Sequence, residues 1–216
     1  ELVRTGLKAL LESENDIVFN IFVIETNKLV NYDSFKNTQT IYPTEPFGYH
    51  TYLNIGIKRG HSDYVFLANN DLTYESGWAT EIIKQMDKNP LIMSASPFCP
   101  QTQHSSLKSS PVIHGYTVRQ QVNGWAIFVK RELFSKIGYL NEYIKYWYSD
   151  NDYALTLQIN KILHCLVTNS VVNHHQYIHG STGTEIFENK NILNDYTNKQ
   201  YGIFINKWKD KLAENS

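Results

Sequence analysis

Carboxylates beside asparagines follow two apolar segments of the chain. These polar groups are Glu25-Thr26-Asn27, after the run 17–24, and Asn69-Asn70-Asp71, after the run 64–68. In open α/β sheets, ligands bind in the crevice beyond the carboxyl ends of the strands. A carboxylate at such a position can bind a base or a ribose, or it can hold a divalent cation that neutralises a diphosphate. The alternative for Asp71 is the N-cap of a helix that begins near Tyr74.

Two further carboxylates, Asp150 and Asp152, lie at the predicted start of a helix over residues 148–162. Ser149 or Asp150 suits an N-cap, and Asp152 suits the first turn, where an acidic side chain stabilises a helix. Because Trp147 precedes them, the same acids also suit a general base beside an aromatic platform for a sugar. Side chains two positions apart point roughly 200° away from each other on a helix, so we expect one of the two to face a cleft.

Three histidines, His174, His175 and His179, follow a predicted strand near the end of the chain. Neutral imidazole is a common ligand of transition metals. Their spacing is not that of a regular metal site, so surface or hydrogen-bonded histidines are the alternative.

Apolar residues recur with helical and strand periods in turn along the chain. Helices are predicted over residues 2–12, 47–60, 78–86, 130–138 and 148–162, and along the tail from residue 188. Strands are predicted over residues 17–25, 64–71, 91–97, 118–130, 164–168 and 170–175, the fourth kinked or split at Gly124. The stretch 31–46 is polar, and 98–110 is expected to be a surface loop. This alternation predicts βαβ units, and the near-continuous apolar strands are typical of a parallel sheet.

Length and composition limit the classes of protein to consider. With 216 residues, 42% of them hydrophobic and 19% charged, the chain suits one domain and excludes a disordered or fibrous protein. Its 20 basic and 21 acidic residues provide no overall attraction to nucleic acid or anionic membranes. Cys99 and Cys165 are too few for a disulfide framework, which fits a reducing compartment. Since no apolar stretch approaches the roughly 18 residues of a membrane span, we expect a cytoplasmic protein.

Taken in order, these segments resemble the inverting family 2 glycosyltransferases of the GT-A fold. The resemblance extends to about residue 183 and rests on LVRTGLKALLES, VIETN, PFGYHTYLNIGIKRG, YVFLANNDLTYESGW, NGWAIFVKRELFSKIGYLNE, YWYSDNDYAL and VVNHH. It implies an α/β fold over residues 1–187, a Rossmann-like three-layer sandwich with a mostly parallel central sheet. Residues 188–216 are predicted to form a packing helix of the same domain. The family's first strand is expected to precede Glu1, because this chain begins at the helix that follows that strand.

The resemblance also implies roles for individual residues. The family's first strand-end acid, which contacts the nucleotide base, falls on Glu25 with Asn27 beside it. The Asp-x-Asp motif of the family falls on Asn69-Asn70-Asp71, which leaves Asp71 as the single carboxylate for the cation. The metal-binding histidine falls on His174 or, in the alternative register, on His175.

The paired acids that lie near the acceptor in this family fall on Ser149-Asp150 and Asp152, with Asp150 as the catalytic base. Gly48 and Asn54 would line the donor pocket, where a glycine lets backbone approach a ligand closely. Trp125 and Trp147 would stack on sugar faces. The alternatives are an ordinary helix-entry turn at Gly48 and core packing for the two tryptophans.

The implied activity is a metal-dependent, inverting transfer of a sugar from a nucleoside diphosphate sugar to an acceptor hydroxyl, with Mn²⁺ or Mg²⁺ as cofactor. A UDP-sugar is favoured, because Glu25 can accept a hydrogen bond from uracil N3–H. The acceptor would be a glycan, a small molecule or another hydroxyl-bearing substrate. Three alternatives stay open: a nucleotidyltransferase of similar α/β frame, a non-catalytic sugar-nucleotide-binding domain, and a glycosyltransferase acting on modified DNA through a local basic cluster such as Lys207, Lys209 and Lys211.

Overall fold

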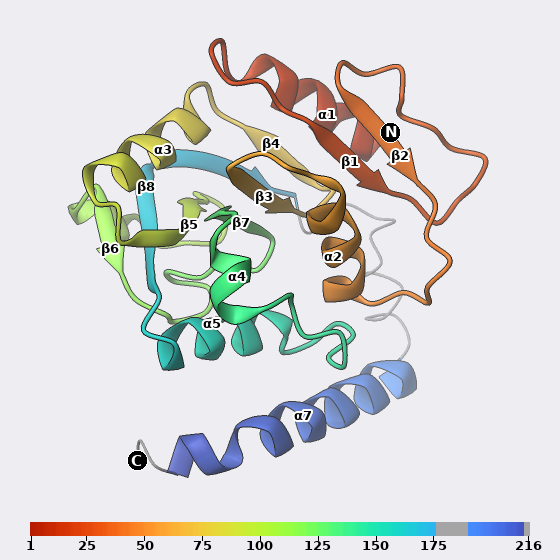
Figure 1. Ribbon diagram of the computed structural model, residues 1–216, viewed down its shortest axis with the longest axis vertical. Helices are drawn as coiled ribbons and strands as arrows, with labels where there is room; N and C mark the ends of the chain where they lie inside the picture. The colour runs from red at the N-terminus through yellow and green to blue at the C-terminus, as the bar shows by residue number, and fades with distance from the viewer. Residues whose placement is uncertain (176–189, 214–216) are drawn as a thin grey trace.

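Six strands form the central sheet of the computed structural model, which describes residues 1–175 and 190–213 (Figure 1). They are β3 (Tyr64–Ala68), β4 (Leu72–Tyr74), β5 (Ile92–Phe98), β6 (Val112–His114), β7 (Ala126–Lys130) and β8 (Leu163–His174). The strand order is β3-β7-β5-β8-β4, and β6 also pairs with β8.

This sheet is mixed, so the prediction of a mostly parallel sheet is wrong. β5 and β8 run parallel, whereas β7 is antiparallel to both of its neighbours, β3 and β5. β4 and β6 are antiparallel to β8. An apolar run indicates that a strand is buried on both faces, but it does not indicate which neighbour the strand joins or in which direction.

Alternate residues of β7 face two different hydrophobic cores, as the two-residue period of a strand requires. Ala126 and Phe128 belong to a core that also includes buried residues of α3 (Trp78–Lys88). Ile127 and Val129 belong to a second core, shared with α2 (Tyr49–Arg59), α4 (Leu133–Ile137) and α5 (Ser149–Ile159). Helices therefore cover both faces of the sheet, which explains why its strands are so apolar.

The helices lie where the apolar periodicity predicts them, beginning with α1 (Leu2–Glu12). α3 begins at Trp78, well after Asp71, so the alternative that Asp71 caps this helix is wrong. Glu14 performs that function instead, since its Oε1 accepts hydrogen bonds from the N–H groups of Ala79 and Thr80 at 2.6 and 3.0 Å. The carboxylate of Asp71 is therefore not used in capping.

Several strands differ from the prediction. β1 (Ile21–Ile24) is shorter than expected and pairs in parallel with β2 (Thr38–Ile41), which lies within the polar stretch where no element was predicted. β7 begins only at Ala126, after the predicted kink at Gly124. The two strands predicted over 164–168 and 170–175 are one continuous strand, β8. Within the predicted loop 98–110 lies a short 3₁₀ helix, η1 (Ser105–Ser109).

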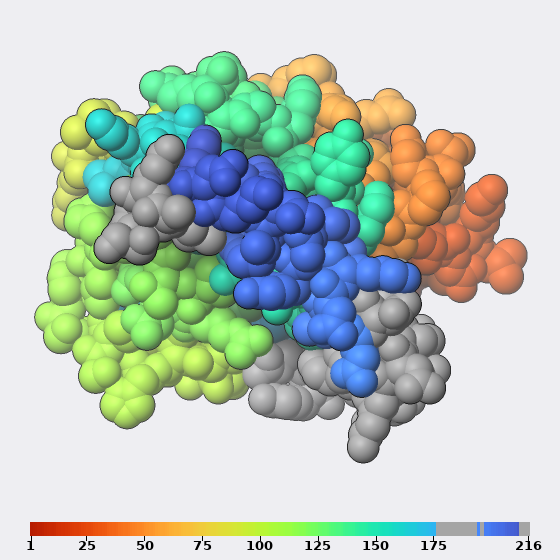
Figure 2. Space-filling view, turned by 90° about the horizontal axis from the view of Figure 1, so that it is seen from below, coloured from red at the N-terminus to blue at the C-terminus, as the bar shows by residue number. Residues whose placement is uncertain are grey.

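The C-terminal helix α7 (Lys190–Ala213) packs against the body of the protein through Phe204 and Trp208, which form a small third core with Ile144. Figure 2 shows α7 lying across one face of the molecule, over the green and teal segments that lead into α5. The predicted domain boundary at residues 187 and 188 lies outside the described residues. Within the described ranges, none of the helices is both long and apolar enough to cross a membrane.

Candidate functional site

Asp71 and His174 meet at the β4 edge of the central sheet, where Nε2 of His174 lies 3.3 Å from Oδ2 of Asp71. Both side chains are buried, with 8% of His174 and 6% of Asp71 exposed. The pairing of β4 with β8 brings them together: Leu72 lies opposite His174, and the carbonyl of Asp71 accepts a 2.9 Å hydrogen bond from the N–H of His175. Two residues predicted to share a cation are therefore neighbours.

Polar atoms of this pair lack hydrogen-bond partners among the described residues. They are Oδ1 of Asp71 and both ring nitrogens of His174, since the 3.3 Å contact does not have hydrogen-bond geometry. Leaving a buried polar group unpaired costs about 1–3 kcal/mol, so atoms of this kind are expected to face a ligand. A carboxylate oxygen and an imidazole nitrogen together suit Mn²⁺, and the oxygen alone suits Mg²⁺. The donor atoms present therefore fit a divalent cation.

The pair supplies two ligands at most. No group of three or more His, Cys, Asp or Glu side chains that could hold a metal ion occurs in the part of the chain that the structure describes. Asn69 stands where the resemblance places a second acid, and an amide oxygen is a neutral ligand. Further ligands would have to be neutral oxygens, water or the oxygens of a bound diphosphate.

Trp125 and His175 distinguish the two registers that the sequence left open. The indole ring of Trp125 stacks on His174, with ring centroids 4.9 Å apart and an interplanar angle of 19°. His175 points to a different partner, because its Nε2 lies 2.8 Å from Oγ1 of Thr73. The structure therefore brings His174 to Asp71, and metal binding by His174 stays a prediction. His179 lies outside the described residues.

Tyr49, at the start of α2, is a site residue that the sequence reasoning missed. Its hydroxyl lies 2.8 Å from the side-chain amide of Asn69 and 2.7 Å from the carbonyl oxygen of Gly124. Both partner atoms, Oδ1 of Asn69 and the carbonyl oxygen of Gly124, are acceptors, so the single proton of the Tyr49 hydroxyl is donated to one of them at a time. Burial, together with the carboxylates of Asp150 and Asp71, raises the pKa of Tyr49 and keeps it neutral. The local pattern identified Tyr49 only as one residue of a helix face.

The turn that carries the predicted metal ligand is held from two sides. The backbone N–H of Asn69 donates to the carbonyl of Trp125 at 2.9 Å, next to the Tyr49 contact. On the other side, a Cβ at Gly6 of α1 would lie 3.0 Å from the carbonyl oxygen of Leu72 and 3.7 Å from that of Asn70. Asn70 itself is exposed. Helix α1 thus packs directly behind this turn, and the absence of a side chain at Gly6 permits it.

Asp150 lies in the first turn of α5 and packs against Gly124, the residue whose carbonyl oxygen contacts Tyr49. A Cβ at Gly124 would lie 2.7 Å from Cβ of Asp150, closer than real Cβ contacts, so this approach requires glycine. Burial raises the pKa of Asp150, and an N–H bond from Asn151 and the charge of Arg119 oppose that rise. A half-buried carboxylate with a raised pKa has the properties of a general base.

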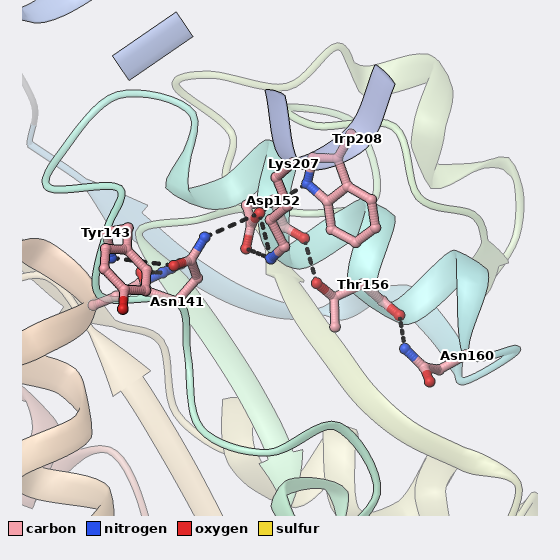
Figure 3. Close-up of polar contacts among 8 residues, drawn as sticks. Asn141, Tyr143, Asp152, Thr156, Asn160, Lys207 and Trp208 are labelled. Carbon is pink, nitrogen blue, oxygen red and sulfur yellow. Dashed lines mark hydrogen bonds and ion pairs between the residues drawn. The ribbon is translucent and has the colours of Figure 1, made fainter. Parts of the chain in front are cut away.

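Asp152 faces in a different direction from Asp150. Its carboxylate accepts hydrogen bonds from Lys207 and Trp208 of α7 (Figure 3). Neither Ser149 nor Asp150 is the N-cap of α5, since that residue is Tyr148, whose side chain makes no capping hydrogen bond. The two acids therefore have separate surroundings, as their spacing on the helix predicts. The predicted contact between Asp152 and an acceptor stays a prediction.

Trp147 follows Tyr146 just before α5, and their rings meet edge to face with centroids 4.9 Å apart. Burial raises the pKa of Tyr146, and the charge of Asp71 raises it further. Stacking of Trp147 or Trp125 on a sugar stays a prediction. One face of Trp125 is already covered by His174.

The residues predicted to bind the donor have structural partners of their own. Glu25, just after β1, accepts hydrogen bonds from the N–H of Asn27 at 2.8 Å and from the hydroxyl of Tyr32 at 3.2 Å. Asn27 is exposed, and its Oδ1 accepts from the N–H of Leu29 at 3.0 Å. These contacts hold Glu25 in a fixed orientation at the end of β1.

Gly48 is the N-cap residue of α2, and Asn54 lies on the second turn of that helix. A Cβ at Gly48 would lie 2.7 Å from Oγ1 of Thr51, so close packing accounts for this glycine. The side-chain amide of Asn54 donates to the carbonyl of Leu140 at 2.9 Å and accepts from the N–H of Leu140 at 3.0 Å. It also donates to the carboxylate of Glu142 at 2.8 Å. Asn54 thus anchors the segment that leads to α5, and contact of either residue with a donor stays a prediction.

Comparison with known proteins shows the fold of the chain. No protein-family model and no curated protein matches it. Among solved structures, residues 1–349 of TarS from S. aureus match at a TM-score of 0.59 and 12% identity, over 81% of this chain and 56% of that one. The mannosyltransferase PcManGT from Pyrobaculum calidifontis, solved with GDP-Man and Mn²⁺, matches at 0.52 and 13%, over 78% and 47%.

The chain therefore has the mixed α/β, GT-A-like fold of glycosyltransferases, and it spans about half the length of the solved chains that it matches. At this level of identity the likeness extends to the fold alone. Membership of family 2 and inversion at the transferred sugar stay predictions.

Proposed function

We propose that the chain is a glycosyltransferase that moves a sugar from a nucleoside diphosphate sugar to an acceptor hydroxyl, with inversion and with the help of Mn²⁺ or Mg²⁺. The observation that carries the proposal is the buried pair of Asp71 and His174, whose polar atoms lack partners in the described structure. The fold supports it, and the neighbour PcManGT was solved with a nucleotide sugar and Mn²⁺.

Asp71 and His174 would hold the cation, next to the strand-end turn of Asn69 and Asn70. A divalent cation bound there would neutralise the negative charge that develops on the leaving diphosphate. Trp125 shields one face of the His174 ring and keeps the ring in place. Tyr49 and Asn69 fix the turn that carries Asp71, so that its carboxylate need not reorganise when the donor binds.

Asp150 would accept the proton of the acceptor hydroxyl as that oxygen attacks the anomeric carbon. Attack from the side opposite the leaving diphosphate gives a single displacement and inverts the sugar. The raised pKa of Asp150, which its burial causes, strengthens it as a base in its ionised form. Glu25 would accept from N3–H of uracil, which makes UDP the favoured nucleotide.

Thermal denaturation with and without Mn²⁺, in the presence of UDP, GDP, dTDP or CMP, tests the donor site. We expect UDP with Mn²⁺ to raise the melting temperature of the wild type, and Asp71→Ala to remove that increase. Asp87→Ala is a matched control, because Asp87 lies near the C-terminal end of α3. Its side chain binds only Tyr64, at 3.4 Å, in the described structure. An unchanged increase in Asp71→Ala would contradict the metal role. A larger increase with GDP than with UDP would contradict the role of Glu25.

Product analysis tests the reaction itself. Incubation of the protein with UDP-sugars and a panel of hydroxyl acceptors should release UDP, and NMR of the product should show an inverted anomeric configuration. Release of pyrophosphate would indicate a nucleotidyltransferase, and retention of configuration would contradict the assignment of Asp150 as the base.

A further inference from the structure

The carboxylate of Asp152 is engaged by two residues of α7 and by Asn141, which precedes α5. Only 2% of Asp152 is exposed, and Nζ of Lys207 lies 2.7 and 2.9 Å from its two oxygens. Oδ1 also accepts from Nε1 of Trp208 at 2.8 Å and from the amide of Asn141 at 3.4 Å (Figure 3). A buried carboxylate with three protein donors has little capacity left for a substrate hydroxyl.

Helix α7 also holds the segment that enters α5. Oε1 of Gln200 accepts a hydrogen bond from the N–H of Lys145. The ring of Phe204 stacks on that of Tyr148, with centroids 5.4 Å apart and planes 22° apart, and Tyr201 contacts the same ring at 5.5 Å. Contacts from two successive turns of α7 therefore converge on the residues just before Asp150.

The entry to α5 needs such support because its backbone is strained. Tyr148 has a φ of 66°, a left-handed conformation that a bulky side chain rarely adopts. Strained residues of this kind persist only where the surrounding contacts hold them. The same segment faces the site on its other side, since the carbonyl of Lys145 accepts a 2.6 Å hydrogen bond from the N–H of Tyr49.

We propose that Asp152 is a positioning residue, tethered to Lys207 and Trp208 of α7, and that this tether sets the first turn of α5 so that Asp150 faces the acceptor. Asp152 does not touch substrate in this arrangement. The proposal rests on the proposed function, in which Asp150 is the base, and it assigns α7 a part in turnover in addition to packing.

Three variants test the tether: Lys207→Met, Asp152→Asn and the double variant. Lys207→Met keeps an unbranched side chain but removes the ammonium group, whose Nζ lies 4.5 Å from the centroid of the Trp208 ring. The carboxylate is then buried without its counter-charge, so the melting temperature should fall. In the double variant that carboxylate is gone, so the melting temperature should recover while the tether remains broken. Turnover is measured as release of UDP from a UDP-sugar, together with the KM for that donor.

We expect kcat to fall about tenfold or more in all three variants, since a small misplacement of a reacting group can cost two orders of magnitude. The donor KM and the increase in melting temperature with UDP and Mn²⁺ should stay at wild-type values. Lys207→Arg should restore turnover, because it restores the charge. Lys84→Met is the matched control, since it breaks a 3.0 Å ion pair with Glu81 on α3, on the opposite face of the sheet, and should leave kcat unchanged.

Recovery of kcat together with the melting temperature in the double variant would show a merely structural role and overturn the proposal. Loss of turnover in Asp152→Asn with full turnover in Lys207→Met would also overturn it, because Asp152 would then act on substrate directly. If Asp152→Asn does not fold, Trp208→Phe removes one donor to the carboxylate and takes its place. Failure of the proposed function looks different: the wild type would release no UDP, or Asp150→Asn would be fully active.

Discussion

The indole ring of Trp125 lies almost parallel to the imidazole of His174, with ring centroids 4.9 Å apart and planes 19° apart. Trp125 immediately precedes β7 and His174 ends β8, so the stack joins two strands that lie on either side of β5. The tryptophan covers one face of the imidazole and leaves the ring nitrogens, which lie in the ring plane, as the atoms that can bind a ligand.

His174→Gln should weaken UDP binding chiefly when Mn²⁺ is present, because the variant loses a metal ligand and keeps a polar side chain. A tenfold loss of affinity would remove about 1.4 kcal/mol of stabilisation by the ligand. His175→Gln is the control, since the imidazole of His175 contacts Thr73 and not the carboxylate of Asp71. Thermal denaturation with and without Mn²⁺ measures both variants. Equal losses of UDP binding with and without Mn²⁺ would indicate that His174 has only a packing role.

Asp150→Asn should lower turnover by about 10²-fold or more, because the amide keeps the shape of the side chain but cannot accept the proton. The KM for the donor should barely change. Since burial raises the pKa of Asp150, wild-type kcat/KM should be lost with falling pH at a point above the ordinary aspartate value of about 3.9. Full activity of Asp150→Asn would contradict the base, and loss in Asp152→Asn alone would move the assignment by two residues.

Gly124→Ala should displace the start of α5, because the new Cβ would lie 2.7 Å from Cβ of Asp150. We expect turnover to fall by about tenfold or more, as for other misplaced reacting groups, while the effect of Mn²⁺ and UDP on the melting temperature stays nearly the same. Gly202→Ala is the control, since no heavy atom lies within 4 Å of a Cβ there. Wild-type kcat in Gly124→Ala would show that the position of Asp150 is not critical.

Tyr49→Phe should loosen the turn that carries Asp71, because it removes the hydroxyl that binds Asn69 and Gly124. The expected results are a weaker Mn²⁺-dependent effect of UDP and a stability loss of about 1 kcal/mol, typical of one hydrogen bond. Tyr116→Phe removes a comparable 2.9 Å hydrogen bond, to the carbonyl of Ile162, in another part of the protein. Similar binding of UDP and Mn²⁺ by the two variants would limit Tyr49 to a structural role.

Stability should fall as pH decreases from about 6.5 to 4, because His164 is buried as a neutral ring. Its Nδ1 lies 2.7 Å from Oγ of Ser94 and its Nε2 lies 2.9 Å from the carbonyl of Gln121. Burial lowers the pKa of His164 to about 4, below its ordinary value of 6.5, so the unfolded chain takes up the proton first. The contribution is complete above pH 6.5 and is lost at about 1.4 kcal/mol per pH unit below it.

Urea denaturation at pH 7.5 and pH 4.5 measures this loss. His164→Gln, which cannot be protonated, should show a smaller difference in unfolding free energy between the two pH values than the wild type. A wild type whose unfolding free energy is the same at both values would contradict the prediction.

Local sequence patterns determined the helices and the residue types of the site. Apolar positions recur with the helical period in α1 and α3, and burial of those positions against the sheet drives these helices to form. The same local reading singled out Asp71, Asp150 and His174, since each lies where an apolar run changes to polar residues at the end of a strand or the start of a helix.

The tertiary structure alone decided direction, register and partners. β7 runs antiparallel between β3 and β5, although its apolar sequence suits either direction. The pairing of β4 with β8 selects His174 over His175 as the neighbour of Asp71. The ammonium of Lys207 in α7 binds the carboxylate of Asp152, and the hydroxyl of Tyr49 binds the side chain of Asn69. Each of these contacts joins residues far apart in the chain, and the pattern around one residue contains no information about a distant partner.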